Sequence, residues 1–257
     1  MFKLMKYEFM KMRVTLLVML LALVGLEIGF IAGNQLGRDD MVGVSIALLV
    51  MLVFAVYLYI LIAGLVSYSR ELNDKTGYMT FMTPVSPAGV VASKLLFVML
   101  AALVAAALFG WAAYYDLAFL IRRANIDPEL YRQADSMFKF AARGGSLTGF
   151  LMNAGAMAAA VVIQILAVEC TAYLAITLSA TILQNRRGFV RGLLSFALFA
   201  ALQYALTWAG DMAVGEASAE SAAELMAYLG KSAALNGAFS VVCAGAAAWL
   251  MDRRVSL

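Results

Sequence analysis

The sequence contains no histidine, only two cysteines and little charge. Without histidine, catalysis by imidazole and metal sites with histidine ligands are excluded. Cys170 and Cys243 both lie in apolar runs, where a thiol packs as a small hydrophobic side chain, so no disulfide framework is indicated. Basic residues exceed acidic ones by only three (19 against 16) and are spread along the chain, so nothing points to nucleic acid.

The chain is rich in apolar residues and poor in charged ones. They make up 64% of the chain, and charged residues make up 14%. Soluble domains are about half apolar and about a quarter charged. The composition therefore predicts an integral membrane protein.

Six segments supply the roughly 20 mostly apolar residues that a spanning helix needs. They are 14–32, 41–66, 95–121, 147–183, 190–208 and 232–251. We therefore predict an all-α membrane protein with a single transmembrane domain over residues 1–257. The fourth segment exceeds the thickness of the hydrocarbon, so it must tilt, project beyond the bilayer or break near Glu169. The first is long, contains Glu27 and has no clear cleavage site, so we interpret it as a retained helix and not as a signal peptide.

Residues 1–13 have the pattern of a helix that rests in the membrane interface. Phe2, Met5, Phe9 and Met12 recur every three to four residues, and the basic residues lie elsewhere. Six spans put both termini on one side of the membrane. Twelve of the 19 lysines and arginines then fall on the side of the termini, which predicts that both termini are cytoplasmic, although the basic connection 122–146 opposes this orientation. The outer connections 122–146 and 211–231 either cover helix ends or shape an exit.

A compact polar insert, residues 67–94, separates the second and third spans. Asn73 as an N-cap and Pro84 as a stop predict a short helix over 73–83. Methionine and aromatic side chains on such a helix suit docking into a groove of another protein, but an interfacial turn that returns the chain to the bilayer fits the same pattern. The residues that would contact a partner are Arg70, Glu71, Asp74, Lys75, Gly77, Tyr78, Met79, Phe81, Met82 and Pro84.

The layout as a whole resembles a known family. The N-terminal KYEFMKMR, the six spans, and an insert carrying Arg70-Glu71, Gly77, Thr83-Pro84 and Ser93-Lys94 are together similar to permease subunits of type-2 ABC exporters. This chain has Tyr78-Met79-Thr80 where many members place a threonine and a glutamate after the glycine.

The resemblance implies that residues 73–83 form a coupling helix in a cleft of a nucleotide-binding subunit. It implies two copies of that ATPase subunit, which would bind ATP and Mg²⁺, a second permease, identical or homologous, and a bacterial cytoplasmic membrane. The chain itself would be no enzyme and would need no cofactor. Gly230-Lys231-Ser232 looks like the end of a Walker A motif, but Leu225 stands where that motif requires glycine.

Polar residues inside the apolar runs are the candidates for a translocation path, because hydrocarbon rejects unpaired polar groups. They are Glu27, Gln164, Glu169 and Asn236. The amides can equally hold helices together by hydrogen bonds. Gly25, Gly29 and Gly33 recur every four residues and predict a ridge on which a neighbouring helix packs closely.

The sequence thus predicts a permease subunit that exports a peptide, lipid or drug by alternating access, coupled to a separate ATPase. Two alternatives stay open. One is a secondary transporter driven by ions through Glu27 or Glu169, and the other is a membrane anchor or sensor subunit that transports nothing. The partners expected in every case include membrane lipids.

Overall fold

The computed structural model describes residues 2–73, 86–123, 147–183, 189–215 and 222–254. The described residues form six long α-helices: α1 (Phe2–Gln35), α2 (Asp39–Asn73), α4 (Pro87–Arg123), α6 (Leu147–Ile182), α7 (Phe189–Val214) and α8 (Ala222–Arg254). Each is long and apolar enough to cross a membrane. The predicted all-helical class is confirmed, and each of the six predicted spans falls within a helix that is a candidate membrane span, apart from Leu183, which follows the last residue of α6.

Most of the helices extend beyond the predicted spans. A helix satisfies its own backbone hydrogen bonds, so nothing forces it to end where the hydrocarbon ends. Residues 1–13 and 14–32 were predicted as two elements, but α1 is one uninterrupted helix from Phe2. Likewise α4 begins at Pro87, which puts Lys94 inside a helix, and α6 passes Glu169 without a break.

The connections are correspondingly shorter than predicted. Residues 211–214 belong to α7 and 222–231 belong to α8, so most of the predicted outer connection 211–231 is helical. Asn73, the predicted N-cap, is the last residue of α2. The rest of the predicted coupling helix (74–83) and residues 124–146 of the other outer connection lie outside the described residues.

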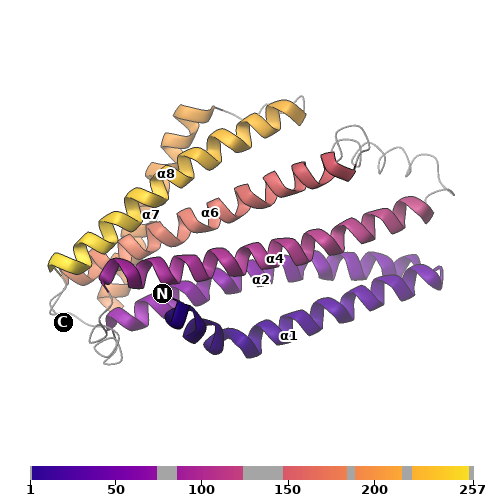
Figure 1. The fold of residues 1–257 in the computed structure, drawn as a ribbon, viewed down its shortest axis with the longest axis horizontal. Helices are drawn as coiled ribbons and strands as arrows, with labels where there is room; N and C mark the ends of the chain where they lie inside the picture. Colours follow the sequence, from indigo (N-terminus) through magenta and orange to yellow (C-terminus); the bar gives the residue numbers. More distant parts are fainter. Residues whose placement is uncertain (1, 74–85, 124–146, 184–188, 216–221, 255–257) are drawn as a thin grey trace.

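Both chain ends lie at the same end of the bundle, as an even number of spans requires (Figure 1). At the opposite end a tight turn joins α1 to α2. Gly37 adopts a left-handed backbone with φ of 66°, a conformation that costs a residue without Cβ little. The helices of this hairpin approach closely, since a Cβ built on Gly33 would lie 2.9 Å from the Met41 Cβ.

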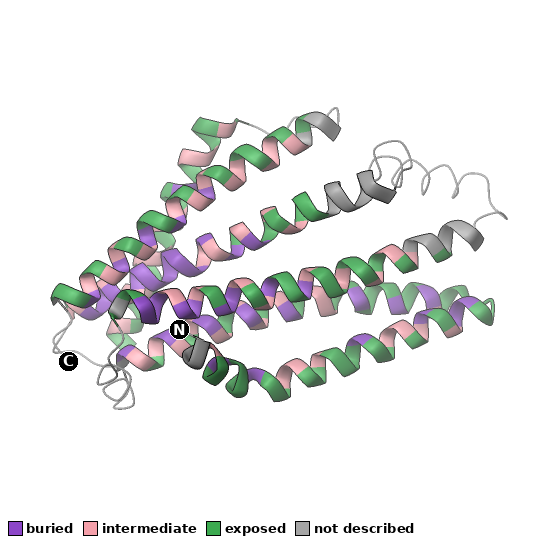
Figure 2. Cartoon of the chain, in the orientation of Figure 1, coloured by how far each residue is buried: buried purple, intermediate pink, exposed green. Residues whose placement is uncertain are grey.

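The centre of the bundle is α6. In its most apolar stretch 56% of the residues are buried, against 6% in α7. Burial is concentrated toward the end that carries the termini (Figure 2). Cys170 and Cys243 are free and buried in one apolar cluster between α6 and α8, which confirms that they are packing residues.

Candidate functional site

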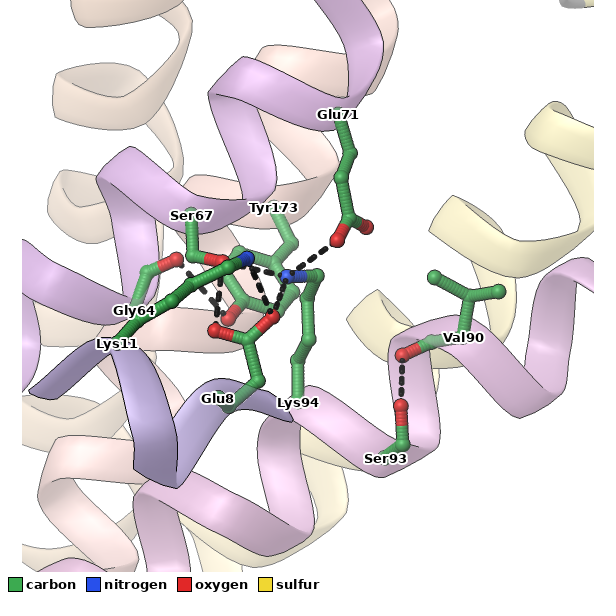
Figure 3. Close-up of polar contacts among 9 residues, drawn as sticks. All are labelled: Glu8, Lys11, Gly64, Ser67, Glu71, Val90, Ser93, Lys94 and Tyr173. Atoms are coloured by element: carbon green, nitrogen blue, oxygen red, sulfur yellow. Dashed lines mark hydrogen bonds and ion pairs between the residues drawn. The ribbon is translucent and has the colours of Figure 1, made fainter. Parts of the chain in front are cut away.

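A buried ion-pair cluster joins α1, α2 and α4 (Figure 3). Its centre is Lys94 of α4, whose side chain is 3% exposed. The Lys94 Nζ lies 2.8 Å from Glu8 Oε1 of α1 and 2.9 Å from Glu71 Oε1 of α2. Lys94 also donates a hydrogen bond to Ser67 Oγ (2.6 Å), and Ser67 donates one to Glu8 Oε2 (2.8 Å). One ammonium group thus holds two carboxylates from two other helices.

The local sequence of α4 and α2 explains where their members of the cluster lie. On α4, the Ser86 hydroxyl accepts a hydrogen bond from the Gly89 amide (3.2 Å), the geometry of an N-cap, and Pro87 occupies the first helical position. This fixed start puts Lys94 two turns into the helix. On α2, Ser67 and Glu71 are four residues apart and therefore share a face.

The cluster is stable only because its charges are paired. Removing ions from water costs several kcal/mol each, and only close partners offset that cost. Lys11, 59% exposed, lies 3.3 Å from the same Glu8 oxygen and adds a weaker contact from the solvent side. Glu71 Oε2 has no hydrogen-bond partner among the described residues.

A layer of tyrosines connects this cluster to the other half of the bundle. The rings of Tyr68 on α2 and Tyr173 on α6 stack with centroids 4.0 Å apart and planes 13° apart. The Tyr68 hydroxyl hydrogen-bonds to the Thr177 hydroxyl (2.6 Å) and lies 3.2 Å from the Met251 sulfur of α8. Tyr173 donates a long hydrogen bond to the Gly64 carbonyl (3.4 Å). The end of α2 is therefore fastened to α6 and α8 as well as to α1 and α4.

Of the predicted partner-contact residues, the structure brings only Glu71 into the cluster. Arg70 is exposed on the same helix. The other eight residues lie outside the described part of the chain: Asp74, Lys75, Gly77, Tyr78, Met79, Phe81, Met82 and Pro84. Their proposed contact with a partner stays a prediction.

The predicted carboxylates of the translocation path lie in two separate places. Glu169 is fully buried, and neither of its oxygens has a hydrogen-bond partner among the described residues. It faces the backbone of α2, because a Cβ built on Gly64 would lie 2.6 Å from Glu169 Oε1. Glu27 of α1 instead lies beside Asp116 of α4, and its Oε1 is buried without a hydrogen-bond partner among the described residues.

The predicted amides and glycines lie at helix contacts. The Asn236 amide of α8 donates to the Gln164 oxygen of α6, so this pair joins two helices as the packing interpretation requires. Gly29 faces Ser45, and Gly33 faces the start of α2. A Cβ on Gly25 would meet nothing within 4 Å, so the ridge is close-packed only toward the turn.

Two members of the cluster, Glu8 and Ser67, were not singled out from the sequence. A signal for Glu8 was present, because positions 5, 8 and 12 share a helical face. In the structure Glu8 and Met12 are buried on that face, while Phe9, which the apolar stripe favoured, is 54% exposed. The buried side of the N-terminal helix therefore carries a carboxylate, which a purely hydrophobic reading overlooks.

The arrangement fastens helices to one another. The ammonium is fully engaged, and within the described residues no three Cys, Asp or Glu side chains are placed to hold a metal ion together. No known protein family, no curated protein and no solved structure matches this chain.

Proposed function

We propose that this chain is the membrane-spanning permease subunit of an ATP-driven exporter. It would act with two copies of a separate ATPase subunit and with a second permease. Its substrate would be hydrophobic or amphipathic, in keeping with spans that carry few fixed charges.

The observation that carries this proposal is the ion pair between Glu71 and Lys94, which lie near the two ends of the insert. Glu71 stands two residues before the end of α2, Lys94 lies near the start of α4, and their charged atoms are 2.9 Å apart. A displacement applied to the part of the insert between these two residues would therefore move α2 and α4 together. Glu8 would carry the same displacement to α1, and the stacked Tyr68 and Tyr173 would carry it to α6. This is the property that a coupling element between an ATPase and a helix bundle needs.

Two kinds of variant separate docking from transmission. Replacing Tyr78 and Phe81 by alanine removes apolar anchors from the insert and should abolish co-purification of an ATPase. Lys94→Met leaves the insert surface intact, so the ATPase should still co-purify while transport and substrate-stimulated ATP hydrolysis fall. Lys11→Met, which removes an exposed charge beside the same Glu8, is the matched control and should leave both properties unchanged. Retention of ATPase binding and transport in the Tyr78 and Phe81 variant would contradict the proposal.

An ion-coupled secondary transporter is the second candidate, favoured by the Glu27 and Asp116 contact and by the unpartnered Glu169. Protonatable carboxyls inside spans are typical of proton relays. Transport by the isolated chain in proteoliposomes under a pH gradient, without any ATPase, and its loss in Glu169→Gln would support this candidate. Transport that requires ATP and a second subunit would exclude it.

A further inference from the structure

An apolar groove runs along the outside of the first three helices. Its volume is about 510 Å³, within the range of about 300–1,000 Å³ that is typical of ligand pockets. The walls include Leu17 and Leu20 of α1 and Leu100 and Val104 of α4, all well exposed, and Val56 and Ile60 of α2 are buried at its base. These three helices run side by side in Figure 1.

One charged side chain, Arg13, lines this groove, and on α1 only Phe9 lines it nearer the N-terminus. Arg13 is exposed, and among the described residues it has no ion-pair partner. Along α1 the next charged residue is Glu27, so Arg13 marks the point where the helix passes from a polar to an uncharged stretch. The groove therefore has a cationic mouth near the termini and an apolar body.

The part of the groove that begins at Arg13 corresponds in length to one leaflet of a bilayer. The lining residues on α1 extend from Phe9 to Leu23, and the part from Arg13 to Leu23 covers ten residues, which at the helical rise is roughly 15 Å. That is about half of a hydrocarbon core about 30 Å thick. On α4 the lining residues run in the same direction, from Phe97 to Phe109.

We propose that this groove binds one phospholipid with an anionic headgroup, taken from the leaflet on the side of the termini. An acyl chain lies along Leu17, Leu20 and Val104, and the headgroup phosphate accepts hydrogen bonds from the Arg13 guanidinium, whose planar fork matches phosphate oxygens. A lipid with no net charge lacks the excess negative charge that the unpaired Arg13 attracts. The site therefore prefers anionic to zwitterionic lipid.

Competitive lipid retention tests this site without any ATPase, so its outcome does not depend on the transport proposal. The purified full chain is incubated in detergent with equimolar dioleoyl phosphatidylglycerol and dioleoyl phosphatidylcholine, and the lipid that remains after gel filtration is measured by mass spectrometry. We expect retention of the anionic lipid to exceed that of the neutral lipid about fivefold, the effect of one basic side chain near a charged headgroup. Arg13→Gln should bring the two to equality, whereas Lys6→Gln, an exposed basic residue outside the groove, should leave the preference intact.

A second pair of variants tests the apolar body. Ala101→Phe fills the groove from α4 and should release both lipids, while Ala113→Phe, on the same helix beyond the groove, should not. Arg13 is exposed, so its variant keeps the test decisive if Ala101→Phe does not fold. Equal retention of the two lipids by the native chain, or equal effects of Arg13→Gln and Lys6→Gln, would overturn the proposal. A chain that elutes as a dimer, retains no lipid and cross-links to a second copy through Leu20→Cys would overturn it in favour of a protein–protein interface.

Discussion

Replacing Lys94 by methionine should destabilise the protein more than any other single change of charge in the cluster. The variant keeps most of the side-chain volume but leaves Glu8, 7% exposed, and Glu71, 17% exposed, without the ammonium that both contact. Removing one partner of a buried ion pair costs about 3–5 kcal/mol. Because Glu71 retains some contact with solvent, we expect the lower value, about 3 kcal/mol.

The matched comparison uses Lys11, which contacts the same Glu8 oxygen from an exposed position. Lys11→Met should cost less than about 1 kcal/mol, the usual worth of a surface pair. Thermal unfolding in detergent, followed by circular dichroism, measures both. A loss of about 3 kcal/mol corresponds to a fall in the melting temperature of about 6–12 °C in a chain of this size.

The Lys94 variant also has a specific rescue. Adding Glu8→Gln and Glu71→Gln removes the two uncompensated charges, so most of the lost stability should return. If Lys94→Met and Lys11→Met lower the melting temperature equally, or if the two glutamines give no rescue, then the ion pairs do not hold these helices together and the reasoning fails.

Two further predictions concern the contacts beside the cluster. Gly64→Ala forces a Cβ to within 2.6 Å of Glu169 Oε1 and should lower the free energy of unfolding by about 1–3 kcal/mol, measured by thermal unfolding. Gly43→Ala is the control: it has open space around it and should be neutral or slightly stabilising. A Gly64 variant as stable as the native chain would show that α2 and α6 are not in close contact there. Tyr68→Phe removes the hydrogen bond to Thr177 but keeps the ring stack. Because the Thr177 hydroxyl also bonds to a backbone carbonyl, chemical denaturation should show a loss of stability of only about 0.5–1.5 kcal/mol. A loss several times larger would mean that the hydroxyl, and not the stacked ring, dominates this contact.

The six spans could be predicted from the sequence because the bilayer imposes a length and a composition on each of them. The helix ends could not, since hydropathy reports where the hydrocarbon begins and not where the backbone stops being helical. Lys94 shows the difference: hydropathy put it just outside a span that begins at 95, whereas the helix begins at Pro87 and the side chain is buried.

Only some members of the ion-pair cluster could be named from the sequence, for a related reason. Glu71 and Lys94 were named because they belong to the polar insert 67–94 and to the motifs that resemble type-2 ABC permeases. Glu8 is 86 positions away from Lys94 and was hidden in a helix with an obvious apolar stripe. Pairing at that distance is a property of the assembled bundle, so a pattern within one helix could indicate that Glu8 faces inward but could not name its partner.

The slight burial of α7 has a consequence for how the bundle assembles. Lipid tails cover apolar surface as well as protein does, so a helix with 6% of its apolar stretch buried gains little from docking. A hydrogen bond from Gln203 to Thr171 of α6 (2.8 Å) adds a directed contact to the packing of α7 on α6. We therefore expect α7 to separate from α6 more readily than α8, whose contact with α6 is more extensive.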